Sequence, residues 1–387
     1  MKRNYLIVIC TSIVILMFTV GCTEFIDPVY IGNEEDEDVW TNSHYAHGVL
    51  DKVYDWINDE SSDLYGIEDD YFSDNSVENN DIARYATGGA SASYYPLGRW
   101  DFHYRNIINI NQYLEYGLEL PINIADTVPT DRVEEKLFRF GEAHFLRAWS
   151  ESELLKQYGG PVDAAKSQFL GIPLLRDVYT TDEISEIARS TYEECVSAIL
   201  NDLDTAIAYC PFEYDNSTPA TSDQYTGRAT QRAALALKSR VLLFAASPAY
   251  NTTNDVSKWE DAAAAAYDAI MMDGGLMDLG DLDDENNETH VDVIWKTLRS
   301  RSNSLEEDHF PPSFYGRGRC NPSQNLVDAF PMADGTPILH EFSTFDKNNP
   351  YANRDERFDE FIVYNGESLY DYKTIQTYIG GDDAKGG

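Results

Sequence analysis

Hydrophobic residues recur at helical spacing over much of the first two thirds of the chain. From Thr41, in TNSHYAHGVLDKVYDWI, apolar residues fall three or four positions apart, which predicts a helix with one apolar side. The same spacing returns in RWDFHYRNIININQYLEYG and in TDRVEEKLFRFGEAHFLRAWSESELLKQYGG. The last of these closes on Gly159 and Gly160, a common stop signal for a helix. We therefore expect a mainly α-helical, all-α fold with minor β structure.

Two pairs of these helical segments resemble each other. When Ala143 is set on Ala234, AHFLRAW aligns with ALALKSR, and Arg147 meets Lys238. Each segment is followed by a second helical stretch, which opens with TYEEC or KWEDA. Helix pairs of this kind predict tetratricopeptide-like hairpins, although long insertions interrupt the period. The stretch GRATQRAALALKSRVLLFAASPAYN is apolar on almost every side, so we expect it to be buried.

The remaining segments are irregular. Residues 58–98 are rich in Asp, Asn, Ser, Gly and Tyr, and loops of that length in a compact domain usually carry function. From about residue 281 the pattern changes to polar loops, short helices and a strand-like run in FIVY. We expect one domain over 41–387. Its helical repeats would cover about 41–275, and an irregular ligand-facing region would cover about 281–387.

The first 21 residues have the pattern of a secretory signal peptide. A basic MKR precedes a mostly apolar run of 16 residues, and small Gly21 stands directly before Cys22. Glycine followed by cysteine at this point resembles the lipobox of bacterial lipoproteins, so we expect cleavage before Cys22, lipidation of that residue and a tether over 22–40. The alternative is an uncleaved membrane anchor, but a span needs roughly 20 apolar residues. Several acyl chains would hold the protein stably at a membrane.

Net charge and the positions of Cys and His limit which partners, metal sites and disulfides the chain can form. The net charge of −38 repels phosphate backbones, so a nucleic acid partner is not expected. No cofactor is expected, apart from a structural Ca²⁺ that the acidic clusters could hold. Cys195 and Cys210 are placed on one helix, which separates them by about 22 Å, too far for a disulfide. His44 and His47 have a helical offset but no obvious third ligand, so no zinc site is predicted.

Catalytic motifs are weak. Adjacent acids such as Asp69 and Asp70 are common by chance among 67 acidic residues, and adjacency does not make two carboxyl groups converge. The sequence contains no GxSxG, Walker or HExxH motif. His144 and Glu153 look like an acid and a base, but the repeat places His144 opposite Leu235, at a routine packing position. Both residues are therefore interpreted as scaffold, and the protein is not expected to be an enzyme.

Aromatic residues are more informative than acidic ones. The chain holds 26 tyrosines and six tryptophans, and several lie in polar, irregular segments such as DDYFSDNS and SYYPLGRW. A ring presents a flat apolar face that can stack on the C–H face of a sugar, while neighbouring polar groups bind its hydroxyls. The alternative is that these rings only pin loops onto the body. The candidate ligand-binding residues are Trp100, Tyr95, Tyr94, Tyr71, Asn75, Tyr315 and Arg317.

Several blocks, in order along the chain, together resemble the SusD/RagB family. They are FLRAWSESELLKQYGG, STYEECVSAILNDLDTAI, GRATQRAALALKSRVLLFAASPAYN, NPSQNLVDAFPMADG and NPYANRDERFDEFIVYNG, and the likeness covers about residues 22–366. The resemblance implies four tetratricopeptide-like hairpins and a surface-exposed outer-membrane lipoprotein of Bacteroidetes. It also implies a binding protein for nutrients, mostly glycans, that forms a lid on a SusC-like TonB-dependent transporter and has no enzymatic activity.

The chain departs from the family pattern at its end. Family members usually continue past the NRDERF block into a further helical segment, so a C-terminal truncation is expected here. The predicted function is capture of oligosaccharides at the cell surface and their delivery to the transporter. Two alternatives stay open: an exported glycoside hydrolase that uses an acidic pair, and a helical-repeat adaptor that binds only protein.

Overall fold

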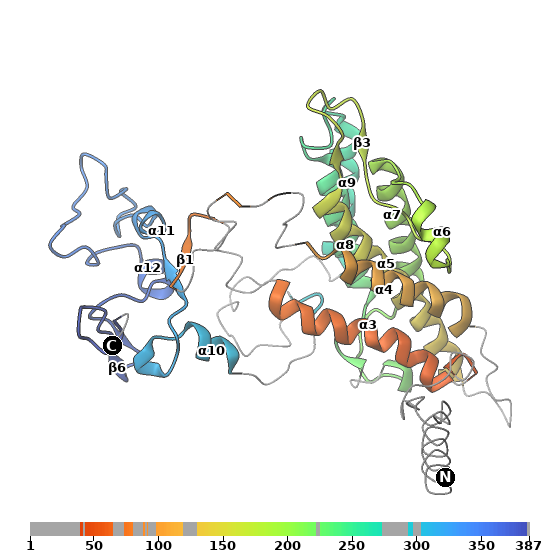
Figure 1. Cartoon of the computed structure of the whole chain (residues 1–387), viewed down its shortest axis with the longest axis horizontal. Coiled ribbons are helices and arrows are strands. Elements are labelled where there is room, and N and C mark those ends of the chain that lie inside the picture. The colour runs from red at the N-terminus through yellow and green to blue at the C-terminus, as the bar shows by residue number, and fades with distance from the viewer. Residues whose placement is uncertain are drawn as a thin grey trace, which may run out of the picture.

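The computed structural model describes residues 39–41, 43–64, 73–79, 88–89, 91, 98–118, 130–221, 225–272, 293–296 and 303–384. Within these ranges the chain forms ten α-helices and six very short strands, so the prediction of a mainly α-helical fold is confirmed. Figure 1 shows the described elements in two groups, a helical body and a smaller C-terminal body. No helix in the described ranges is long and apolar enough to span a membrane.

The helical body is built from stacked helices. Its elements are α3 (Ser43–Leu64), α4 (Trp100–Gln112), a π-helical turn (Tyr113–Gly117), α5 (Thr130–Tyr158), β2 (Gly160–Pro161), β3 (Phe169–Leu170), α6 (Thr181–Glu186), α7 (Tyr192–Tyr209), α8 (Gln231–Ala246) and α9 (Val256–Met272). Helix α5 packs on α7, α8 packs on α9, and α7 joins the two pairs. These pairs are the hairpins that the internal alignment predicts.

Helix α5 is the centre of the core. Its residues from 141 to 155 are almost continuously buried, on several sides of the helix, because α4 and α7 pack against it. It ends where the glycine pair predicts. A Cβ at Gly159 would lie 2.5 Å from the carbonyl oxygen of Leu155, so a residue without a side chain closes this helix. Helix α7 begins with a capping box in which Thr191 and Glu194 bind each other's backbone N–H groups.

The C-terminal body combines residues 303–384 with β1 (Ser76–Glu78), a short strand that follows α3 in the sequence. It holds α10 (Ser304–His309), a 3₁₀ turn (Pro312–Phe314), β4 (Cys320–Pro322), α11 (Gln324–Ala329), α12 (Glu356–Phe361), β5 (Ser368–Leu369) and β6 (Lys373–Thr374). Strand β1 pairs antiparallel with β4, with Val77 opposite Asn321. Residues about 240 positions apart in the sequence therefore form one small sheet, which Figure 1 shows beside α11.

Three details of the predicted pattern were wrong. Helix α3 continues to Leu64, because a helix can extend through polar residues without an apolar stripe. Helix α8 is not buried all round: Leu243 and Phe244 are exposed, since the described neighbours of α8 cover only part of its surface. The expected strand in FIVY is replaced by α12 and an irregular stretch after it.

The described cysteines are all free, and Cys195 and Cys210 stand at the two ends of α7. Their separation along one helix therefore rules out a bond between them, as predicted.

Candidate functional site

Trp100, the first residue of α4, lines a groove of about 720 Å³. A volume of several hundred cubic ångströms suits a small-molecule or oligosaccharide segment. The groove lies between α4, α3 and the segment that leads from β3 to α6. Its lining residues are Trp56, Trp100, Asp101, Tyr104, Arg105, Ile108, Asn109, Gln112, Pro173, Leu175 and Ile184.

The periodicity of α4 separates its groove side from its core side. Trp100, Tyr104 and Ile108 are four residues apart, so they follow one another along the groove. The opposite side of the helix packs into the core through Phe102, Ile107 and Ile110, which are buried. One helix thus supplies both a fixed base and a row of side chains that face solvent.

Aromatic contacts hold the rings of the groove in place. The centroid of the Trp100 ring lies 4.7 Å from that of Tyr104 and 4.9 Å from that of Tyr158, the latter edge to face. On α3, the ring of Trp56 lies 4.5 Å from the guanidinium carbon of Arg105. This is cation–π distance, so Arg105 is oriented by Trp56 while it remains exposed.

The opposite side of the groove is an irregular stretch, residues 171–177, which we call the wall segment. The hydroxyl of Tyr104 donates to the carbonyl of Pro173 at 2.7 Å, and the amide of Asn111 donates to the carbonyl of Leu175 at 2.9 Å. At the start of the segment, the Ile172 N–H donates to Sγ of Cys195 at 3.3 Å. These bonds tie an irregular backbone to two helices, α4 and α7, so the groove has a defined width.

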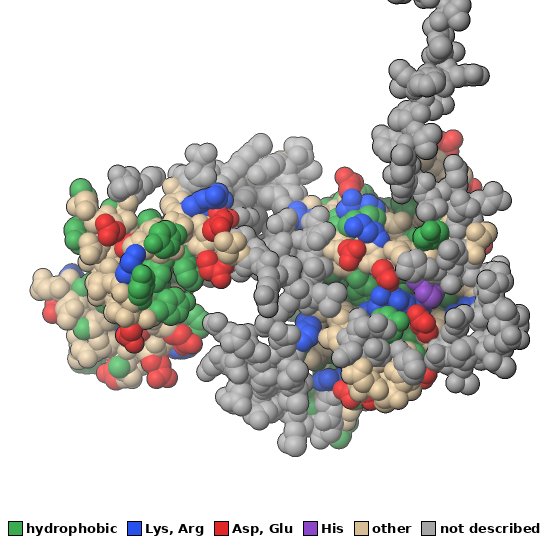
Figure 2. Space-filling model, turned by 90° about the horizontal axis from the view of Figure 1, so that it is seen from below, with side chains coloured by type: hydrophobic (Ala, Val, Ile, Leu, Met, Phe, Trp, Pro, Cys, Tyr) green, Lys and Arg blue, Asp and Glu red, His purple; other side chains and the backbone are tan. Residues whose placement is uncertain are grey.

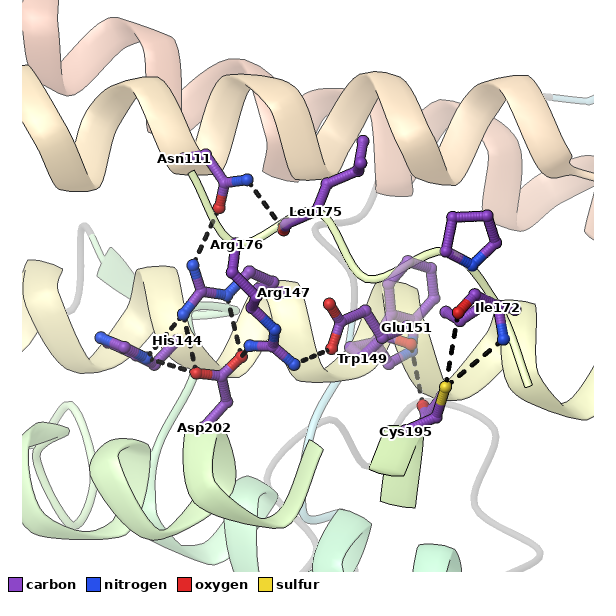
Figure 3. A network of polar contacts seen from close by, with 12 residues as sticks. Asn111, His144, Arg147, Trp149, Glu151, Ile172, Leu175, Arg176, Cys195 and Asp202 are labelled. Atoms are coloured by element: carbon purple, nitrogen blue, oxygen red, sulfur yellow. Dashed lines mark hydrogen bonds and ion pairs between the residues drawn. The ribbon is translucent and has the colours of Figure 1, made fainter. Parts of the chain in front are cut away.

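A buried polar network lies beneath the wall segment (Figure 3). Arg147 on α5 donates from Nε and Nη2 to the two carboxylate oxygens of Asp202 on α7, both at 2.8 Å. Its Nη1 donates to Oδ1 of Asn111 on α4 at 2.8 Å. Arg176, from the wall segment, also bonds Asp202 and reaches Glu151 on α5. The wall segment is thereby bonded to α4, α5 and α7.

The pKa values of the two carboxyl groups in this network, Glu151 and Asp202, are shifted in opposite directions. Burial raises the pKa of Glu151 to about 8, because Arg176 compensates only part of the cost and the charge of Asp202 lies nearby. Burial also acts on Asp202, but hydrogen bonds from Arg147 and His144, together with the charges of Arg147 and Arg176, hold the pKa of Asp202 below its usual range. The network therefore binds Asp202 as a carboxylate, and Glu151 favours the protonated form.

His144 and Glu153 do not form an acid–base pair. Nδ1 of His144 lies 2.7 Å from Oδ1 of Asp202, inside the network, whereas Glu153 pairs with Lys156 on its own helix. Nine residues of one helix separate them by about 13 Å along the axis. Glu153 borders a cavity of only about 30 Å³, which is too small for a sugar. Both residues serve the packing of α5.

The structure separates the predicted ligand-binding residues into two places. Trp100 lies in the groove of the helical body, whereas Asn75, Tyr315 and Arg317 lie in the C-terminal body. There the carbonyl of Asn75 accepts from the N–H of Ser323 at 2.7 Å, beside the β1–β4 pair. Arg317 forms an ion pair with Asp308 at 2.7 Å, and Tyr315 is almost fully exposed. Tyr71, Tyr94 and Tyr95 lie outside the described residues.

Sequence reasoning missed Trp56, Tyr104 and Arg105. All three stand on helices whose apolar residues were interpreted as core. The available signal was the four-residue spacing of Trp100, Tyr104 and Ile108 on a helix whose other side already had a complete apolar stripe. Among the described residues, no group of three or more His, Cys, Asp or Glu side chains is arranged to hold a metal ion.

Two family models match this chain. Residues 30–243 match a family described as "Starch-binding associating with outer membrane", and residues 281–385 match the SusD family. A search of curated protein sequences finds no match.

Solved structures agree with the family matches. A SusD-like protein from Bacteroides fragilis is 25% identical, with a TM-score of 0.64 over 90% of this chain and 68% of that one. A SusD-like carbohydrate binding protein from the same species is 20% identical, with a TM-score of 0.61 over 85% of this chain and 61% of that one. The chain thus spans between three fifths and just over two thirds of these relatives. With its helical hairpins and its two matching regions, it belongs to the SusD family.

Proposed function

We propose that this protein captures oligosaccharides at the outer surface of the cell and passes them to a TonB-dependent transporter. The observation that carries the proposal is the groove formed by Trp56, Trp100, Tyr104 and Arg105. Its aromatic rings offer apolar faces for sugar C–H groups, and Arg105, Asn109 and Gln112 offer hydrogen bonds for hydroxyls. Family membership supports the choice of a glycan, since the family is described as starch-binding.

The charge distribution favours binding over hydrolysis. A glycosidase needs two carboxyl groups about 5 to 9.5 Å apart across the sugar. Among the described residues that line the groove, Asp101 is the single acidic one. The nearby carboxyl groups of Glu151 and Asp202 are turned into the buried network and are bonded to arginines. The groove can thus hold a sugar, but the described part of its lining has no second carboxyl group to complete an acid–base pair.

The cellular part of the proposal rests on the N-terminus and the family. Lipidation at Cys22 would anchor the protein, and the family description places its members at the outer membrane. A lipid-anchored binding protein next to a channel raises the local concentration of ligand at the channel entrance. We therefore assign the delivery step to a SusC-like transporter partner.

The test compares two tryptophans with the same exposure. Trp100 in the groove and Trp259 on α9 are each 37% exposed. We expect Trp100→Ala to weaken oligosaccharide binding at least fivefold in titration calorimetry, because a stacked aromatic ring contributes about 1–3 kcal/mol to binding. Trp259→Ala should bind like the wild type. Far-ultraviolet circular dichroism should show the same helix content for all three proteins.

Equal affinities of the wild type and the Trp100→Ala variant would remove the groove from the proposed function. An equal loss in both variants would point to a general effect on the fold.

A further inference from the structure

Three exposed tyrosines gather on the C-terminal body, two of them beside Lys373 and the third, Tyr370, beside Phe314. Tyr315, Tyr370 and Tyr372 are 89%, 72% and 70% exposed. The ammonium nitrogen of Lys373 lies 5.6 Å from the ring centroid of Tyr315, 5.5 Å from that of Tyr372 and 5.9 Å from that of Phe314. We call these five residues the tyrosine platform. Figure 2 shows hydrophobic side chains gathered on this body, with charged side chains between them.

Two of these tyrosines have a backbone conformation that suits other residues better. The φ angles are 68° at Tyr315 and 53° at Tyr370, both in the left-handed region. Glycine and asparagine adopt this region at low cost, whereas a bulky side chain there is an outlier. Three of the other described non-glycine residues with positive φ are asparagines. The Tyr370 ring contacts those of Phe310 and Phe314, with centroids 6.2 and 6.3 Å away, but both tyrosine rings remain largely exposed. Strained residues of this kind cluster at ligand contacts.

The backbone beneath the rings of the tyrosine platform is held by several hydrogen bonds. Nζ of Lys373 donates to the carbonyl of Ser313 at 2.5 Å. The N–H groups of Ser313 and Gln376 donate to the two carboxylate oxygens of Asp383 at 2.8 and 2.9 Å. The turn after Phe310 is tight, because a Cβ at Gly316 would lie 2.0 Å from the carbonyl oxygen of Phe310. A ligand would therefore meet rings that are already positioned, which lowers the entropy cost of binding.

The charges around the platform select a class of ligand. The ammonium of Lys373 contacts three rings and a carbonyl. Hydrogen bonds from Gln376 and Ser313, and then the charge of Lys373, lower the pKa of the nearby Asp383. The charge of Lys373 is thus compensated within the body. The whole chain carries a net charge of −38, which repels anions. The platform therefore suits uncharged sugar rings better than uronate or sulfated ones.

We propose that the tyrosine platform is a second contact site for an uncharged glycan, separate from the Trp100 groove, with sugar rings stacked on Tyr315, Tyr370 and Tyr372. This inference rests on the proposed glycan-binding function and adds a site and a ligand class to it. The polysaccharide would span both bodies, and two moderate contacts on one chain would raise the overall affinity through avidity.

The test exploits the strained backbone. Asparagine at positions 315 and 370 removes both rings and fits the left-handed conformation, so Tyr315→Asn/Tyr370→Asn should melt at the wild-type temperature or above it. The full chain, in detergent, is run in native gels that contain soluble starch, laminarin, β-mannan or polygalacturonate. We expect retardation of the wild type by at least one of the three neutral polysaccharides. The double variant should lose at least fivefold in affinity for that polysaccharide.

Matched variants separate the possible results. Tyr378→Asn removes an exposed ring from the same body outside the platform and should be retarded like the wild type. Tyr315→Phe keeps the ring and should retain most of the binding. Unchanged retardation of the double variant, with a loss in Trp100→Ala, would overturn the platform and leave the proposed function intact. Retardation by polygalacturonate alone would overturn the ligand class. Absence of retardation in all four gels would overturn both proposals.

Discussion

At the level of single residues, the main feature is a buried charge network that supports the groove wall. Arg176 links the wall segment to Glu151 and Asp202, which lie on different helices. Partners this distant in sequence could not be predicted, since nothing in the local pattern around Glu151 distinguishes it from other acids on α5. By contrast, Trp100 was predicted as a candidate because an aromatic residue beside a polar segment is visible locally, and the structure places it in a groove.

Glu151 should make stability depend on pH. Its pKa is raised to about 8 by burial, so folding takes up a proton between about pH 5 and 8, and stability falls as pH rises through this range. One proton corresponds to a slope of at most about 1.4 kcal/mol per pH unit. In Glu151→Gln this contribution should vanish. Urea unfolding of both proteins at pH 5.5, 6.5 and 7.5 measures the slopes, and parallel slopes would contradict the assignment.

At the level of elements, helix ends were predicted better than helix lengths. The stop at Gly159 and the start at Thr191 follow from local signals, a glycine pair and a capping sequence. The extension of α3 to Leu64 carries no such signal, because exposed polar turns of a helix look like loop in sequence. The partial exposure of α8 also could not be predicted from the sequence, because it depends on which neighbouring elements pack on the helix.

Two glycines inside helices should respond oppositely to alanine. A Cβ at Gly141 of α5 would lie 2.7 Å from the backbone nitrogen of Cys210, at the end of α7, so Gly141→Ala should destabilise by about 1–3 kcal/mol. A Cβ at Gly48 of α3 would meet nothing within 4 Å, so Gly48→Ala should stabilise by about 0.5–1 kcal/mol. Thermal and urea unfolding would measure both. A gain in both variants would show that α5 and α7 can separate without cost.

At the level of the whole molecule, the pairing of β1 with β4 joins two segments that lie far apart in the sequence. It brings residues after α3 into the C-terminal body, where Asn79 donates from Nδ2 to the carbonyl of Arg317 at 2.8 Å. Asn75 and Tyr315 were predicted as ligand contacts from two separate irregular segments, 58–98 and about 281–387, and no pairing between these segments was predicted. Three-residue strands are too short to be recognised from alternation, so this connection could be obtained only from the structure.

The most direct test of the account is binding and turnover measured on the same purified protein. The chain without residues 1–22 is titrated with a panel of neutral and acidic oligosaccharides, and each mixture is then analysed for shortened products. We predict binding of at least one neutral oligosaccharide that is weakened by Trp100→Ala, with the sugar recovered at its original length. Hydrolysis that is lost on mutation of one carboxylate, or absence of binding to every member of the panel, would contradict the account.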